Sequence, residues 1–245
     1  KLLTIAVLIF PTIGFTQNGG EVLVDLESIS FPNMPSHNKR LISILELPFY
    51  DDFSRGLHYP APELWDGKHV LINTTYPINP KAVGVATFDA ISNKGKLHSN
   101  VSISPFSADT LTSHPINLSF PSDTTVYLSF FFQPQGLGSQ PDIRDSLVLE
   151  FFDPDNETWY GAWAAWADFS AKTLYQKNKL KNQTKQIQSD TLQRTFFMVH
   201  LNVNDSKFLV ENFQFRFRNY ASLSSNTDIP GLRGNSDHWH IDLVY

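Results

Sequence analysis

The chain has 245 residues, a net charge of −5 at pH 7 and no cysteine. The lack of cysteine excludes disulfides, thiolate zinc sites and cysteine nucleophiles, and the negative charge gives no general support for nucleic-acid binding. The 20 Phe, 8 Tyr and 5 Trp suit a half-buried pleated surface, so the composition favours strands over helices. The length allows one large all-β domain or two smaller ones.

The first sixteen residues have the pattern of a secretory signal peptide. Lys1 supplies a positive charge, an apolar run extends from Leu2 to Phe10, and small or polar residues precede Gln17. The alternative, a membrane anchor, is disfavoured because the run is too short for a bilayer core of about 30 Å. The sequence predicts cleavage before Gln17 and an extracytoplasmic protein that is secreted, on the cell surface or associated with the outer membrane. No transmembrane segment is expected in the mature chain.

Residues 17–47 contain short apolar pieces separated by Pro32 and Pro35, and we expect a linker or a peripheral strand there. From residue 48 to 245 the pattern indicates about ten short strands joined by polar loops, with 109–113 and 116–118 at an edge and 126–133 in the centre. Such a series predicts an all-β, two-sheet antiparallel β-sandwich of the jelly-roll type.

Residues 171–195 form a basic insert. Six basic residues stand against one acid, Asp190, which gives the insert a charge of +5 and leaves −10 for the rest of the chain. The insert could bind an anionic polymer or surface. We favour a solvated loop or short helix between strands, because Tyr175 is the one aromatic residue among the lysines.

The last nine residues alternate between apolar and polar positions. The alternation predicts a strand with one side in the core and the other carrying polar groups. The core side would hold Trp239, Ile241, Leu243 and Tyr245, and the other side His238, His240, Asp242 and Val244.

Three interpretations of this polar side stay open. The one we favour is structural: Arg216 and Arg218 point outward from an alternating strand at 213–220 and could pair with Asp242 across one sheet, beside Glu150. Alternatively, the side chains of Arg216, Arg218, His238, His240 and Asp242 could form a binding face for a sugar or peptide. Two histidines at i and i+2 with a carboxylate could also hold a transition metal, but the sequence places no further ligand beside them.

Motifs for catalysis are absent from the sequence. There is no Gly-x-Ser-x-Gly, no His-Glu-x-x-His and no phosphate-binding glycine loop. Glu150 and Asp153 could suggest a glycosidase pair, but residues i and i+3 of a strand point to opposite faces. We therefore expect a protein that is not an enzyme.

Several stretches together resemble the MAM-like and lectin-like jelly-roll modules of extracellular proteins. They are Asp51-Asp52-Phe53, the apolar strand that ends in Gln133-Pro134-Gln135-Gly136, residues 145–152, the strand around Trp163, residues 213–218, and the closing His240-Ile241-Asp242. The cysteines of vertebrate MAM modules have no counterpart. Residues 85–90, 109–113 and 213–222 look like parts of secreted or surface proteins of Bacteroidetes, some of them linked to type 9 secretion and gliding.

This resemblance implies a non-catalytic exported interaction module of a cell-surface or type 9 secretion/gliding-associated protein, whose partner is a protein or a glycan. The alternative is a carbohydrate-binding or adhesion module that is accessory to an extracellular enzyme. The resemblance also implies that further residues follow Tyr245 in the full protein. No cofactor is expected apart from a structural calcium ion, which jelly-roll modules often bind near their first strand; Asp51, Asp52 and Asp89 are its candidate ligands, unless they only cap turns.

Overall fold

The computed structural model describes residues 43–56, 58–120, 122, 125–168, 173–180, 182–188, 195–223 and 237–245. These residues belong to one compact unit, Asn38–Tyr245. The expected signal peptide, residues 17–42 of the expected linker, and residues 171–172, 181 and 189–194 of the basic insert lie outside the described part. The statements about them stay predictions.

Twelve strands are present in the described residues. They are β1 (Trp65–Lys68), β2 (Leu71–Asn73), β3 (Val85–Phe88), β4 (Phe106–Ser113), β5 (Tyr127–Pro134), β6 (Ser146–Asp153), β7 (Thr158–Asp168), β8 (Thr173–Asn178), β9 (Gln183–Gln188), β10 (Phe197–Asn202), β11 (Phe215–Ala221) and β12 (Trp239–Asp242).

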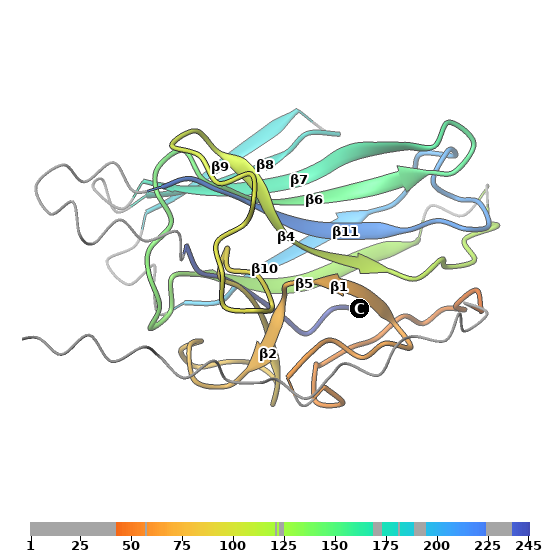
Figure 1. The fold of residues 1–245 in the computed structure, drawn as a ribbon. Coiled ribbons are helices and arrows are strands. Elements are labelled where there is room, and N and C mark those ends of the chain that lie inside the picture. The colour runs from red at the N-terminus through yellow and green to blue at the C-terminus, as the bar shows by residue number, and fades with distance from the viewer. Residues whose placement is uncertain are drawn as a thin grey trace, which may run out of the picture. The chain divides into compact units, whose positions relative to one another are not determined.

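The strands form two antiparallel sheets. One has seven strands in the order β1-β4-β11-β6-β7-β8-β9, and the other has five in the order β10-β5-β12-β3-β2. Figure 1 shows β6, β7 and β11 in one layer and β5 in the other. From β3 to β12 the chain changes sheet at every step except along the hairpins β6-β7-β8-β9. Strands that alternate between two packed sheets in this way make a jelly roll, which confirms the predicted fold class.

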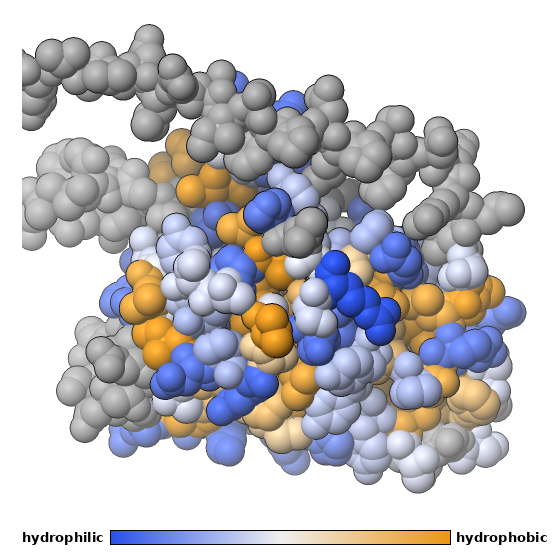
Figure 2. Space-filling view, turned by 90° about the horizontal axis from the view of Figure 1, so that it is seen from below, coloured by the Kyte–Doolittle hydropathy of each residue, from blue (hydrophilic) through white to orange (hydrophobic). Residues whose placement is uncertain are grey.

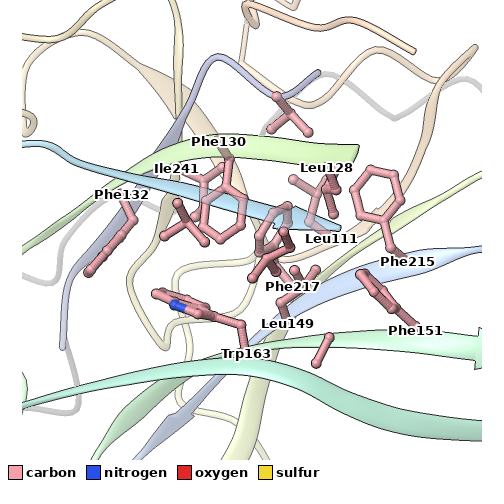
Figure 3. Close-up of a cluster of buried hydrophobic side chains, with 14 of the residues drawn as sticks. Leu111, Leu128, Phe130, Phe132, Leu149, Phe151, Trp163, Phe215, Phe217 and Ile241 are labelled. Atoms are coloured by element: carbon pink, nitrogen blue, oxygen red, sulfur yellow. The ribbon is translucent and has the colours of Figure 1, made fainter. Parts of the chain in front are cut away.

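The core between the sheets consists mainly of aromatic side chains. Along β11 buried and partly exposed residues alternate, so Phe215 and Phe217 point inward. Phe217 meets Phe130 of β5 edge to face, with ring centroids 4.8 Å apart, and Trp163 of β7 meets Phe132 at the same distance (Figure 3). Each such pair adds about 0.5–1.5 kcal/mol to the stability that area burial provides.

The structure confirms one of three expectations about individual strands and contradicts two. Residues 126–133 are central, as predicted, because β5 lies between β10 and β12. The expected edge strand at 109–113 is wrong: β4 starts earlier and lies inside its sheet, between β1 and β11, and residue 116 makes isolated bridges only. The basic insert forms the hairpin β8–β9 in its described part, instead of a loop or helix.

The predicted alternation of the last strand holds only as far as Asp242. Trp239 and Ile241 are fully buried in the core, as expected. Leu243 then has a positive φ of 51°, a conformation that breaks the extended strand. In consequence Val244 enters the core, whereas Leu243 is partly buried and Tyr245 is exposed.

Some large apolar side chains reach the surface. Figure 2 shows hydrophobic residues in several groups between hydrophilic ones on one face. Leu47, Phe120, Tyr127 and Tyr245 are each more than 40% exposed. Contiguous apolar surface often marks a contact site.

Candidate binding face

The polar side of β12 is buried beneath the loop that precedes β3. His238 is 6% exposed, and His240 and Asp242 are fully buried. The ring of Tyr76 lies 4.9 Å from that of His238. The backbone N–H of Lys81 donates to Oδ2 of Asp242 at 2.5 Å. These side chains therefore connect the loop to the sheet, and they do not form a displayed row.

Asp242 does not pair with Arg216 or Arg218, so that prediction is wrong. β12 belongs to the five-stranded sheet and β11 to the seven-stranded sheet. Asp242 instead accepts hydrogen bonds from the backbone of Lys81 and Ala82. Burial raises the pKa of Asp242, although these hydrogen bonds act in the opposite direction. The five residues proposed as one binding face thus lie on two different sheets.

His240 is a neutral, fully hydrogen-bonded core histidine. Its Nδ1 lies 2.9 Å from Oγ1 of Thr87, and its Nε2 lies 3.1 Å from the carbonyl oxygen of Gln135. Gly136 has a φ of 60°, and a Cβ on it would come within 2.7 Å of the same Nε2, so this tight turn requires glycine. Burial lowers the pKa of His240 to about 3.

We expect His240 to make the fold sensitive to acid. Below its ordinary pKa of 6.5 the unfolded chain gains a proton that the folded chain does not bind until about pH 3, so stability falls with pH across this window. Denaturant titrations should show a loss of about 3 kcal/mol from His240 between pH 7 and pH 4. The His240→Gln variant should be less stable at pH 7, but its free energy of unfolding should fall less between pH 7 and pH 4 than that of the unchanged chain. An equal loss in both proteins would contradict a neutral buried imidazole.

Arg216 and Arg218 meet Glu150 on the outer side of the seven-stranded sheet. Nε of Arg216 donates to Oε2 of Glu150 at 2.6 Å, and Arg218 donates to the same oxygen. Burial raises the pKa of Glu150, but the hydrogen bonds from Arg218 and Arg216 outweigh burial and hold it below its ordinary value of 4.5. Glu150 is therefore a carboxylate at neutral pH, held between two guanidinium groups.

Aromatic side chains lie at both ends of this charged cluster. At one end Trp159 packs on Phe152 at 5.0 Å, and the guanidinium carbon of Arg216 lies 4.0 Å from the centre of its ring. At the other end Trp166 and Tyr175 are nearly parallel, with centroids 5.7 Å apart. Tyr220 pairs with Ser146, and Trp166 pairs with Tyr175. Since Leu147 pairs with Ala165, the next position puts Ser146 beside Trp166, and the four residues form one row across β11, β6, β7 and β8. The side chains of all four residues in this row are partly exposed.

We call this surface the outer face. It comprises Phe152, Trp159, Trp166, Tyr175 and Tyr220 with Glu150, Arg216, Arg218, Lys177 and Lys179. The two aromatic ends, at Ser146 and Phe152 of β6, are six positions apart, which is roughly 20 Å along a strand. Asp168, two residues after Trp166 at the end of β7, also points to this face. The four cationic side chains therefore outnumber two carboxylates, and the outer face is positive on a chain whose total charge is −5.

Sequence reasoning named Arg216, Arg218 and Glu150 but missed the aromatic ends. Trp159 and Trp166 are seven residues apart, and strict alternation would send them to opposite faces. A β-bulge between Leu149 and Glu150 of the β6 pairing, where Ala162 is the extra residue of β7, returns both tryptophans to the same face. Trp163, which lies between them, goes to the core instead. The three closely spaced tryptophans were the available signal.

The candidate calcium ligands do not come together. Asp51 accepts hydrogen bonds from Nε1 of Trp65 at 2.6 Å and from the backbone of Phe53, and Asp52 caps Ser54. Asp89 instead lies near Asp109. The pKa of Asp89 is raised to about 7, mainly by burial and next by the negative charge of Asp109. Among the described residues no three His, Cys, Asp or Glu side chains are placed to hold a metal ion. The set of His238, His240 and Asp242 is therefore not a metal site in this structure.

Comparisons with known proteins give distant structural likeness only. No family model and no curated protein sequence matches the chain. A carbohydrate-binding module, CBM28, specific for non-crystalline cellulose is 15% identical with a TM-score of 0.34, and covers 74% of this chain and 86% of its own. A laminarinase from Flavobacterium sp. UMI-01 is 9% identical with a TM-score of 0.40, covering 80% and 97%. A LamA variant from Z. galactanivorans in complex with laminaritriose and laminaritetraose is 10% identical with a TM-score of 0.41, covering 82% and 98%.

Proposed function

We propose that the chain is a non-catalytic carbohydrate-binding module of an exported protein and that a polysaccharide binds along its outer face. The observation that carries this proposal is the row of partly exposed rings Tyr220, Trp166 and Tyr175 on the outer side of one sheet, with a charged cluster beside it. Aromatic rings offer rigid apolar area to the C–H faces of sugars, and Arg and Glu side chains bond hydroxyl groups.

The carboxylates of the outer face support a role without catalysis. Glycoside hydrolysis requires two carboxyl groups, one of which must be protonated at working pH. β6, β7 and β11 place two carboxylates on this face, Glu150 and Asp168, and the pKa of Glu150 is lowered rather than raised. Glu150 is paired with Gly161, seven residues before Asp168 on β7, so the two lie roughly 20 Å apart along the strand, which is too far for a glycosidase pair. Asp153 is turned to its own loop, where it bonds Asn156. A glycosidase acting here would lack a second carboxyl group at the required distance from Glu150.

The positive charge of the outer face favours an acidic polysaccharide. Lys177 of β8 is paired with Ala164 of β7 and lies in the same row as Arg218. Lys179 lies over Gly161, where a Cβ would approach its Cδ to 3.1 Å. Lys177 is two residues from Tyr175 on β8, so a uronate or sulfate group bound beside the aromatic row could reach it. Binding of such polymers is expected to weaken with salt.

We also propose that the module works outside the cytoplasm, on the pattern of residues 1–16, in a surface or type 9 secretion-associated protein. None of the described residues lies in a helix long and apolar enough to span a membrane. A surface location would bring the outer face into contact with extracellular polymers.

Affinity gel electrophoresis tests the proposal. The purified chain should be retarded by alginate or polygalacturonate at low ionic strength, less so at high ionic strength, and by neutral β-glucan more weakly. Runs with and without calcium separate direct binding from bridging by the cation. If only neutral polymers retarded the chain, the proposed preference for acidic polysaccharides would be wrong, but carbohydrate binding at the outer face would still be supported. Migration unchanged in every polymer would contradict the proposed function.

A further inference from the structure

Two buried carboxyl groups and a buried hydroxyl group meet at one end of the sandwich. Asp145 directly precedes β6, Ser222 directly follows β11, and Asp237 lies two residues before β12. Because Tyr220 pairs with Ser146, Asp145 and Ser222 leave the seven-stranded sheet side by side, whereas Asp237 leads into the five-stranded sheet. All three side chains are more than nine-tenths buried. The place where they meet therefore joins the two sheets.

The side chains at this place leave three oxygen atoms without a partner. The side chains of Asp237 and Ser222 both contact the carboxyl group of Asp145. The backbone N–H of Asp142 donates to Oδ2 of Asp145 at 3.2 Å, and the backbone N–H of Ser222 donates to the carboxyl group of Asp237. In contrast, Oδ1 of Asp145, Oδ2 of Asp237 and Oγ of Ser222 are buried without a well-aligned hydrogen bond. Buried oxygen atoms in proteins are rarely left so, and three together indicate a ligand.

The two carboxyl groups also repel each other. Burial raises the pKa of Asp145. Burial, followed by the contact with Asp145, raises the pKa of Asp237 to about 9. The negative charge of Asp142 adds to both effects. Two carboxylates this close cannot both be ionised unless a positive charge lies between them.

The basic neighbours in the sequence do not supply that charge. Nη2 of Arg144 donates to the carbonyl oxygen of Ile103 at 2.9 Å. Nδ1 of His238 accepts the backbone N–H of Ser139 at 3.0 Å. In the part of the chain that the structure describes, no basic side chain is among the strongest influences on either carboxyl group.

We infer that a calcium ion binds between Asp145, Asp237 and Ser222 and joins the two sheets at this end. Oxygen atoms are the ligands that calcium takes in proteins, and water completes its shell in irregular sites. A proton shared by the two carboxyl groups would leave Oγ of Ser222 without a partner, whereas one cation contacts all three oxygens. The site differs from the ligands predicted near the first strand, and the inference is independent of the proposed carbohydrate binding.

The ligand set favours calcium over other metals and predicts a modest affinity. Transition metals prefer nitrogen or sulfur ligands, and none is among these three groups. Magnesium requires a nearly regular octahedron and gives up its water reluctantly. With two carboxylates and one hydroxyl group, the dissociation constant should be on the order of 10⁻⁴ to 10⁻³ M, as in extracellular calcium modules.

Three substitutions test the site. Asp237→Asn replaces the carboxylate by an amide that can donate to Asp145, as a protonated Asp237 would, so the variant should fold without the ion. Ser222→Ala removes the third ligand. Asp155→Asn is the matched control, because Asp155 is exposed in the turn at the other end of β6. Each protein is stripped with a chelator and titrated with calcium chloride or magnesium chloride at constant ionic strength, by calorimetry and by thermal melting. Mildly alkaline buffer makes the proton on Asp237 easier to displace.

We expect saturating calcium to raise the Tm of the unchanged chain and of Asp155→Asn by several degrees, with affinities within about twofold of each other. Magnesium should bind at least about tenfold more weakly. Asp237→Asn should bind calcium at least about 30-fold more weakly, and Ser222→Ala about tenfold more weakly, because each loses a ligand.

The inference would be overturned if millimolar calcium neither bound the unchanged chain nor raised its Tm, which is the result expected of a carboxyl pair that only shares a proton. Equal calcium affinities of Asp237→Asn and Asp155→Asn would overturn it as well. Retardation by acidic polysaccharide is measured in parallel without calcium. All three variants should retain it, so failure of the calcium site is distinguishable from failure of the proposed function.

Discussion

Trp239→Ala is expected to lower the free energy of unfolding by about 3–5 kcal/mol. Trp239 is fully buried, and it lies between Phe88 of β3 and Pro134 of β5 in the middle of the five-stranded sheet. Removing its ring would leave a cavity that the rigid strands on both sides cannot close. Denaturant titration at pH 7 followed by fluorescence of the remaining tryptophans measures the loss.

The matched control is the same substitution on the outer face. Trp166 is partly exposed and its ring contacts Tyr175 at the surface. Trp166→Ala should cost less than half as much stability as Trp239→Ala, because solvent can fill the space left behind. Equal losses at the two positions would contradict the assignment of Trp239 to the core and Trp166 to the surface.

Trp166→Ala is expected instead to reduce polysaccharide affinity by about 30-fold, which corresponds to about 2 kcal/mol of binding free energy. Its ring is the centre of the aromatic row, so its loss would remove the largest apolar surface available to a sugar. Affinity electrophoresis over a range of polymer concentrations yields the dissociation constants. Met198→Ala is the control, since Met198 is 51% exposed on β10 of the other sheet and should bind unchanged.

If Trp166→Ala bound polysaccharide as tightly as Met198→Ala, the claim that the aromatic row is part of the binding site would be contradicted. Loss of binding in both variants would indicate a general effect of substitution. The claim that polysaccharide binds the outer face would then have no support. Thermal melts of both proteins, which should remain cooperative, establish that the comparison is made on folded chains.

The sequence predicts inward and outward residues well within a regular strand. Phe215 and Phe217 point inward and Arg216 and Arg218 outward, as the alternation requires. The prediction fails where the backbone departs from an extended conformation. The positive φ of Leu243 inverts the last strand, and the bulge at Ala162 brings Trp159 and Trp166 to one face. Nothing in local composition marks either position.

Pairing between distant strands is the second limit. Arg216 and Asp242 are both outward residues of neighbouring strands in the sequence, which made a cross-strand pair plausible. In a jelly roll consecutive strands enter different sheets, so β11 and β12 are not neighbours and Arg216 meets Glu150 of β6. The sequence predicts Glu150 beside the arginines, but with Asp242 as their partner. The topology therefore determines which acidic residue pairs with the two arginines.

The central claim is that polysaccharide binds the outer face, and the five tryptophans allow it to be tested directly. Trp65, Trp163 and Trp239 are buried, and Trp159 and Trp166 are partly exposed on the outer face. An NMR titration of indole-labelled protein with an acidic oligosaccharide should shift the Trp159 and Trp166 resonances and leave the other three in place. Shifts confined to the buried indoles, or no shift at a saturating concentration of a ligand that binds, would contradict the claim.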